Sequence, residues 1–130
     1  MRKATGLPRF FKTAWFSKAA SKACIGDAVL CAALRQVIIG QADDLGGGVF
    51  KKRLNDNRHR SIILAKDGRF WVFVYLFAKK DRDNIEDNEL AAFKKLAGAY
   101  GCKTEAEITC EIKNGDLLEI CHDDQSQIQK

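Results

Sequence analysis

A chain of 130 residues has room for one hydrophobic core, so a single domain over residues 1–130 is expected. With 46% hydrophobic and 30% charged residues, the composition excludes a largely disordered chain. The longest apolar run, Phe70 to Ala78, is too short to span a bilayer, and the N-terminus lacks the apolar stretch of a secretory signal. A cytoplasmic protein with no membrane partner is therefore expected.

The charge is distributed unevenly along the chain. The formal net charge is +5, but residues 49–82 carry ten basic and three acidic side chains, whereas residues 83–130 carry five basic and eleven acidic ones. A concentrated positive potential attracts polyanions over a long range. The central segment therefore predicts a polyanion partner, and a merely solvated basic surface is the alternative.

The five cysteines are Cys24, Cys31, Cys102, Cys110 and Cys121. An odd number without a CxxC pair or an export signal favours reduced thiols over a disulfide framework. Cys31 lies within an apolar helical pattern and is expected to act as a small core hydrophobe. Neither a metal site nor a cofactor is expected.

The first elements are an aromatic-rich strand and an amphipathic helix. Residues 9–16 (RFFKTAWF) predict a strand or extended arm, with Trp15 and Phe16 as core anchors. Apolar residues then recur with helical spacing from Asp27 to near Gly40. The glycines at 46–48 break all periodicity and predict a tight turn into the next strand, because the Lys-Ser/Thr of a nucleotide-binding P-loop does not follow them.

Three consecutive strands are predicted next, at Val49–Leu54, Arg60–Lys66 and Arg69–Phe77. Asp67-Gly68 favours a two-residue type I′ hairpin between the last two. The third strand is apolar on both faces, which is typical of a central strand covered on both sides. Alternation places Phe70, Val72, Val74 and Leu76 on one face and Trp71, Phe73, Tyr75 and Phe77 on the other.

The last third of the chain predicts two helices and one strand. A helix runs from beyond Asn84 to Gly101, a second covers Glu105–Lys113, and a strand covers Leu117–Cys121. The ends, residues 1–8 and 122–130, are expected to be flexible. The expected fold class is α+β: a mainly antiparallel sheet, built from the three-strand meander and the N-terminal strand, packed with helices.

Basic side chains from three adjacent segments converge in this scheme. Lys51 and Arg53 share a face because they are two residues apart, Arg60 opens the next strand, and Lys79 to Arg82 follow the central strand. Arginine offers a planar fork for two phosphate oxygens, and lysine offers a point charge. The arrangement therefore predicts a phosphate-binding surface.

Three segments resemble the RelE/HigB-like toxins of bacterial type II toxin–antitoxin modules: Asp44 to Arg53, Arg60 to Leu64, and Phe77 to Leu90 (FAKKDRDNIEDNEL). The resemblance covers roughly residues 9–121 and implies a RelE-like fold. It also implies a metal-independent endoribonuclease that cuts messenger RNA, commonly on the ribosome, leaving 2′,3′-cyclic phosphate ends and stopping translation. The implied partner is a cognate antitoxin, often of the helix-turn-helix type, and no small-molecule cofactor is implied.

The resemblance also implies roles for individual residues. RelE carries a catalytic tyrosine where this chain reads Ile85-Glu86, so proton transfer falls to Glu86 or to another residue. Crowded cations disfavour a further positive charge, so Lys79 or Lys51 is the candidate general base. The candidate catalytic residues are Lys51, Arg53, Arg60, Lys79 and Arg82, and the candidate RNA contacts are Lys52, Arg58, His59, Lys80 and Glu86. His59 is expected either to contact phosphate or to transfer a proton.

Three alternatives remain open at this stage. A related branch, the ParE toxins, poisons DNA gyrase instead of cutting RNA. A non-catalytic RNA- or ribosome-binding module would use Tyr75 and Trp71 as stacking residues, although aromatic residues on a central strand more often belong to the core. The third alternative is a toxin that has lost its activity and kept its antitoxin surface.

Overall fold

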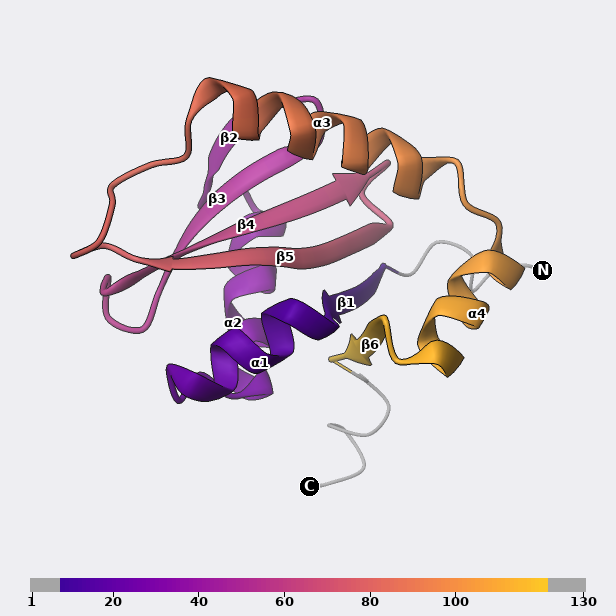
Figure 1. Cartoon of the computed structure of the whole chain (residues 1–130), viewed down its shortest axis with the longest axis horizontal. Helices are drawn as coiled ribbons and strands as arrows, with labels where there is room; N and C mark the ends of the chain where they lie inside the picture. Colours follow the sequence, from indigo (N-terminus) through magenta and orange to yellow (C-terminus); the bar gives the residue numbers. More distant parts are fainter. Residues whose placement is uncertain (1–7, 122–130) are drawn as a thin grey trace.

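The computed structural model describes residues 8–121 as one six-stranded sheet between two layers of helices (Figure 1). The strand order is β2-β3-β4-β5-β1-β6, and every neighbouring pair is antiparallel except β1 and β5. The expected α+β class is confirmed. The expectation of flexible ends at residues 1–8 and 122–130 concerns, apart from residue 8, segments outside the described range. In chain order the elements are β1 (Arg9–Thr13), α1 (Ala14–Lys22), α2 (Asp27–Ile38), β2 (Asp43–Gly46), β3 (Val49–Leu54), β4 (His59–Lys66), β5 (Phe70–Ala78), α3 (Asp87–Gly101), α4 (Glu105–Asn114) and β6 (Leu117–Ile120).

Each face of the sheet has its own hydrophobic core. On one face, Phe73 packs with Phe16 of α1 and Leu34 of α2. On the other, Val72 packs with Ala97 of α3 and with residues of α4. Figure 1 shows α3 lying along one side of the sheet while α1 and α2 cover the opposite side. A central strand between two cores explains why β5 is apolar on both faces.

A β-bulge in β5 overturns the strict alternation predicted for this strand. Ile62 pairs with Tyr75 and Ile63 with Phe73, so the register shifts around Val74. Leu76 therefore joins the α1/α2 core, while Tyr75 and Phe77 turn toward the α3 side. A bulge inserts one extra residue into the strand, so the side chains beyond it point to the opposite faces of the sheet. The predicted grouping holds for the first half of β5 and is wrong for the second.

The N-terminal strand is shorter than predicted because a helix begins inside it. Thr13 ends β1 and caps α1, its hydroxyl accepting a hydrogen bond of 3.1 Å from the backbone N–H of Phe16. Phe16 is fully buried, as expected of a core anchor. Trp15, the other predicted anchor, is 52% exposed, because the helix turns it away from the core. The prediction for Trp15 is wrong.

The predicted glycine turn is preceded by a short edge strand. Asp43 to Gly46 form β2, which pairs with β3 and contains a register shift. Gly47 and Gly48 then reverse the chain with positive φ angles of 63° and 84°. The turn at Asp67-Gly68 has positive φ at both positions, as the type I′ hairpin requires.

Replacing Gly48 with alanine should lower the free energy of unfolding by about 2–4 kcal/mol, since left-handed strain adds to overpacking. A Cβ at this position would lie 2.6 Å from the Ala65 carbonyl oxygen, which is fixed in β4. Gly68→Ala is the matched control, because its φ is also positive but a Cβ there meets nothing within 4 Å. Urea denaturation measures the free energy of unfolding of both variants. Equal losses of stability would show that the contact with the Ala65 carbonyl oxygen does not matter.

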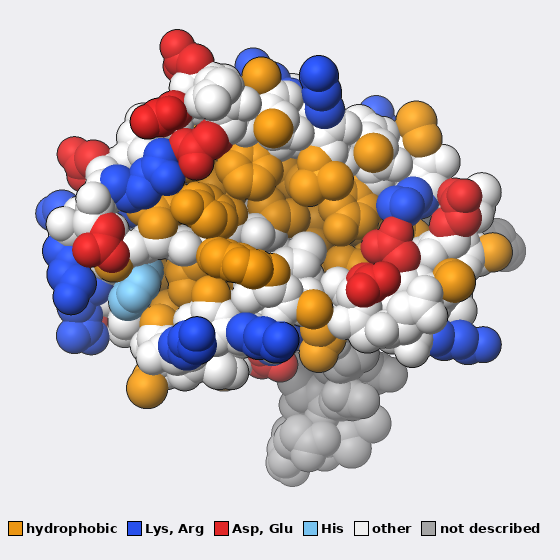
Figure 2. Space-filling view, viewed as in Figure 1, with side chains coloured by type: hydrophobic (Ala, Val, Ile, Leu, Met, Phe, Trp, Pro, Cys, Tyr) orange, Lys and Arg blue, Asp and Glu red, His pale blue; other side chains and the backbone are white. Residues whose placement is uncertain are grey.

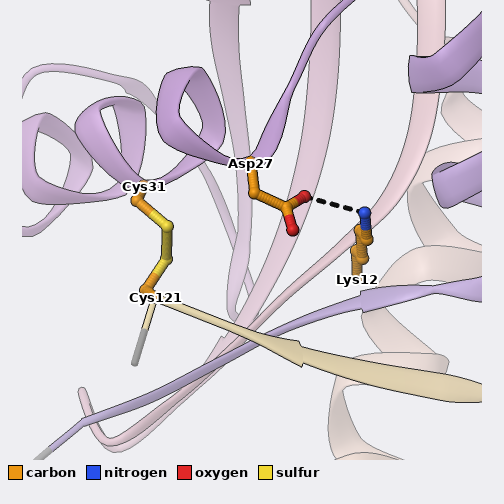
Figure 3. Close-up of a disulfide and its surroundings, with 4 residues drawn as sticks. All are labelled: Lys12, Asp27, Cys31 and Cys121. Carbon is orange, nitrogen blue, oxygen red and sulfur yellow. Dashed lines mark hydrogen bonds and ion pairs between the residues drawn. A yellow bond between two sulfur atoms is a disulfide. The ribbon is translucent and has the colours of Figure 1, made fainter. Parts of the chain in front are cut away.

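The cysteine expectation is wrong for two of the five residues. Cys31 of α2 and Cys121, the residue after β6, form a disulfide across a sequence separation of 90 (Figure 3). Antiparallel pairing of β6 with β1 brings Cys121 beneath α2, a proximity that cysteine spacing does not encode. The same region holds an ion pair of 2.7 Å between Lys12 Nζ and Asp27 Oδ1, which joins β1 to the first turn of α2.

Candidate nucleic-acid interface

The pairing of β3 with β4 brings two arginines together. Arg53 lies directly opposite Arg60 in the antiparallel register, and Lys51 lies opposite Ile62. Val49 and Ile62 belong to the core beneath α3, so alternation directs Lys51, Arg53 and Arg60 toward this same face. The strand phase is the one predicted, with Phe50 and Leu54 packed against the opposite core. We call Lys51, Arg53 and Arg60 the cation triad.

Arg60 is the most unusual member of the triad because it is only 5% exposed. Its guanidinium NH1 donates hydrogen bonds to the backbone oxygen of Asn57, at 3.0 Å, and to Asn57 Oδ1, at 2.9 Å. No carboxylate pairs with Arg60 among the ion pairs found in residues 8–121. Burying a charge without an opposite charge is costly. A buried, oriented and unneutralised guanidinium is therefore suited to an external anion.

The loop that positions Arg60 has an uncommon backbone. Asn55, Asp56 and Asn57 all have positive φ angles, of 56°, 55° and 71°. Asparagine and aspartate tolerate this left-handed region better than other non-glycine residues. The loop turns the Asn57 carbonyl and side chain back onto the guanidinium, which fixes its orientation before any ligand arrives.

Lys51 links the triad to the segment that precedes α3. Its ammonium lies 3.3 Å from Asn84 Oδ1 and 3.6 Å from Asp43 Oδ2 of the edge strand β2. The Asn84 side chain also accepts the backbone N–H of Ile85, at 2.9 Å. Asn84 therefore joins β3 to the start of α3, a role that sequence reasoning missed.

Arg82 is held by a network on the same side of the sheet. Its guanidinium makes two hydrogen bonds to the carboxylate of Glu89 in α3, and its Nε donates to the backbone oxygen of Asn84 at 3.0 Å. Its NH1 also lies 3.5 Å from the Tyr75 hydroxyl, and the guanidinium carbon lies 5.4 Å from the centroid of the Phe77 ring. The bulge in β5 is what turns both aromatic residues toward Arg82.

The Arg82–Glu89 pair shifts both pKa values. Hydrogen bonding to Glu89 raises the pKa of Arg82, and hydrogen bonding to Arg82 lowers the pKa of Glu89. The backbone N–H of Glu86 also donates to Glu89, at 2.7 Å, so this carboxylate both caps α3 and positions Arg82. The sequence pattern predicted this helix, but it did not predict that Glu89 pairs with Arg82.

The arginine partner should be visible in the titration of Glu89. In Arg82→Ala, NMR should show the pKa of the Glu89 carboxyl rising toward its ordinary value. Because the folded pKa is lowered, the pair stabilises the fold above the unfolded pKa, and this contribution is lost as pH falls through the folded pKa. Arg58→Ala, an exposed neighbour, serves as the control and should leave Glu89 unchanged. An unshifted Glu89 in Arg82→Ala would contradict the pairing.

Two predicted RNA contacts lie on the other face of the sheet. Lys52 points toward α2 and donates to the Gln41 backbone oxygen at 2.9 Å, and burial lowers its pKa. His59 is half-buried, with Nδ1 3.1 Å from Asn55 Nδ2, and it lies beside α1 instead of within the triad. Neither side chain lies beside the Arg60 guanidinium, which contacts His59 only at its backbone oxygen, at 3.4 Å.

The remaining predicted residues surround the triad without contacting it in residues 8–121. Lys79 and Lys80 are exposed in the turn after β5, where the Lys79 N–H donates to the Arg58 backbone oxygen at 2.9 Å. Arg58 is itself exposed and bonds to Asn55. Glu86 is the residue that caps α3, which gives it a structural role at the position where proton transfer was considered.

Figure 2 shows how these residues shape the surface. Hydrophobic side chains gather in a hollow between α3 and α1, and lysine and arginine side chains cluster with the histidine at the end where β5 leads into α3. No group of three potential metal-binding side chains is placed together anywhere in residues 8–121. Within the same range, no helix has the length and apolar character needed to cross a bilayer.

Comparison with known proteins gives one family. The model for the RelE toxin of the RelE/RelB toxin–antitoxin system matches residues 8–120, which is nearly the whole of the described chain. Neither the curated proteins nor the solved structures give a significant match.

Proposed function

The chain belongs to the family of RelE toxins of RelE/RelB toxin–antitoxin systems, and from this premise we propose that it is an endoribonuclease that cuts messenger RNA. Family membership makes it the toxin component of such a module, with a cognate antitoxin as partner. The further proposal concerns the reaction: a metal-independent cleavage that leaves a 2′,3′-cyclic phosphate and stops translation.

The buried guanidinium of Arg60 is the observation that carries this proposal. It is oriented by Asn57, has no carboxylate partner in the described ion pairs, and lies opposite Arg53 in the sheet. Two adjacent guanidinium groups suit the non-bridging oxygens of one phosphate. Such preorganised charge stabilises the extra negative charge that develops on a pentavalent phosphorane.

The reaction requires only groups that the chain and the RNA supply. The 2′-oxygen bonds to phosphorus while the bond from phosphorus to the 5′-oxygen breaks, which gives the cyclic phosphate and a 5′-hydroxyl. The proton of the 2′-hydroxyl passes to a base, and the leaving 5′-oxygen takes up a proton. We assign the base to Lys51 or Lys79, since Glu86 caps α3. Arg53, Arg60 and Arg82 carry the electrostatic role.

The partners follow from the same proposal. A messenger RNA substrate places the toxin in the cytoplasm and, for cutting during translation, on the ribosome. A surface with many cations binds the RNA backbone in a salt-dependent manner. The antitoxin, which we propose is of the helix-turn-helix type, has to cover or distort the cation triad to silence the toxin.

Mapping RNA ends after induction in bacterial cells tests the proposal. We expect new 5′ ends within translated messages soon after induction. Purified protein should cut the same messages in EDTA, and the upstream fragment should resist 3′-end ligation until its cyclic phosphate is removed enzymatically. DNA breaks with intact messages would instead identify a gyrase poison. Growth arrest with neither kind of break would leave a non-catalytic module as the better explanation.

A further inference from the structure

A groove beside the cation triad is lined, apart from Arg82, by residues that the proposed cleavage chemistry does not use. It has a volume of about 650 Å³ and runs between α1 and the end of β5. It exists because β1 pairs only with Phe70–Phe73, so no strand of the described chain pairs with this edge of β5 beyond that point. The chain leaves the sheet at Thr13, and α1 runs alongside the open edge.

Aromatic rings form one wall of this groove. Trp15 of α1 stacks on Tyr75 with ring centroids 5.3 Å apart and an interplanar angle of 28°. Tyr75 is supported from behind by Phe77 and Phe93, at 5.7 and 5.9 Å. Trp15 is nevertheless 52% exposed, so it presents much of its indole to solvent. A rigid, supported and open indole is the usual platform for a stacked base.

The charges around the groove identify the class of ligand. Lys18 and Lys22 of α1 and His59 line it together with Asp81, and Arg82, which pairs with Glu89 of α3, lines it as well. In Figure 2, basic side chains border the hollow along α1 and at the end nearest the loop into α3. An aromatic platform bordered by cations fits a single-stranded nucleic acid, whose bases stack while its phosphates follow the positive rim.

The groove is continuous with the cation triad through two residues. Arg82 lines the groove and donates to the backbone oxygen of Asn84. The Asn84 side chain in turn accepts a hydrogen bond from Lys51 of the triad. A nucleotide in the groove and a phosphate at the triad would therefore belong to one short stretch of RNA.

We propose that this groove binds a nucleobase of the RNA substrate next to the cleaved phosphate, stacked on Trp15. The proposal rests on the RNA-cleaving function and adds the substrate contact that separates one RNA segment from another. Trp15 is a binding residue, whereas the triad acts on the phosphate. Loss of Trp15 should thus weaken binding while leaving the chemical step intact.

Binding of uncleavable RNA measures this contact separately from catalysis. The probe is a hexanucleotide with 2′-O-methyl groups throughout, and an abasic oligonucleotide of the same length and charge is its control. We expect the hexanucleotide to quench tryptophan fluorescence in the wild-type protein but not in Trp15→Phe. Trp15→Ala should weaken hexanucleotide binding about tenfold and leave the abasic oligonucleotide unaffected. Ile39→Ala removes an exposed side chain at the end of α2 and should not change the binding of either oligonucleotide.

A charge-reversal pair provides a test that does not depend on Trp15. The double variant Lys18→Glu, Lys22→Glu should weaken hexanucleotide binding more than the charge-matched Lys94→Glu, Lys95→Glu on α3. Equal weakening by the two double variants, or unchanged binding by Trp15→Ala, would overturn the proposal. If Trp15→Ala binds the hexanucleotide normally but loses the cognate antitoxin, the groove is a protein-docking surface and the proposal is wrong.

Failure of the proposed cleavage gives a different result. A protein that binds the hexanucleotide through Trp15 but cuts no message would retain the groove assignment and lose the ribonuclease assignment. If wild type and Trp15→Ala cut messages with the same KM, the ribonuclease assignment would be retained and the groove assignment lost.

Discussion

Arg60→Ala should reduce the rate of RNA cleavage by about 10²–10³-fold, the loss typical of removing one preorganised charge from a reaction centre. The guanidinium is buried, oriented by Asn57 and not paired with a carboxylate among the described ion pairs, so its charge is oriented before a phosphate binds. Arg60→Lys keeps a positive charge but lacks the planar fork, and it should recover only part of the loss. Single-turnover cleavage of a short messenger RNA measures the chemical step directly.

The matched control for this experiment is Arg58→Ala, two residues before Arg60 in the loop that leads into β4. The Arg58 side chain is exposed; it donates hydrogen bonds to Asn55 and lies 4.0 Å from the Asp56 carboxylate, both within the loop. We expect Arg58→Ala to bind RNA slightly more weakly, with a smaller dependence of affinity on salt, and to cut bound RNA at the wild-type rate. Circular dichroism checks that both variants fold. If Arg60→Ala folds and cuts at the wild-type rate, the triad is not the reaction centre.

The elements of the fold were predictable wherever the local pattern was unambiguous. The hairpin at Asp67-Gly68, the helices after Asp27 and Asn84, and the phase of Lys51 and Arg53 all follow from spacing and turn chemistry. Each of these depends on residues close together in the chain, which is where periodicity carries information.

Two features could not be predicted from local patterns, because they depend on contacts between segments or on the cap that starts α1. The bulge near Val74 is a mismatch between two strands, and β5 alone is apolar enough to fit either phase. Trp15 lies on a helix because Thr13 caps it, whereas an aromatic-rich run by itself indicates a strand. Both differences alter the site, since they place Tyr75 beside Arg82 and Trp15 at the groove.

The site was predicted as a set of cations, but its supporting residues were missed. The sequence pattern places Asn57, Asn84 and Glu89 in loops or at a helix start. In the structure, Asn57 bonds to Arg60, Asn84 to Lys51 and Glu89 to Arg82. One feature of the sequence could have indicated Asn57. Asparagine in a short loop between strands often adopts the left-handed conformation, and its side chain often bonds to neighbouring groups. Nothing in the sequence could pair Glu89 with Arg82 in preference to the other nearby acids.

Reduction of the Cys31–Cys121 disulfide should lower the free energy of unfolding by about 4–5 kcal/mol in the chain-entropy model, because a crosslink over such a long loop strongly restricts the unfolded chain. The loop between the two cysteines contains the cation triad and α3, whereas α1 precedes it in the chain. Urea denaturation with and without a phosphine reductant measures the loss. Cys121→Ser should reproduce it, since Cys121 follows β6 and is only partly buried against the α1/α2 core.

Cys24→Ser is the control, because Cys24 is an exposed free thiol and its loss should change stability by less than about 0.5 kcal/mol. If the oxidised and reduced proteins were equally stable, the disulfide would not stabilise the fold. The result bears on the function, since thioredoxin and glutathione keep cytosolic thiols reduced. A toxin acting on messenger RNA would there work in its less stable, reduced form. Alkylating free thiols before cell lysis, followed by mass spectrometry, shows which form the cell contains.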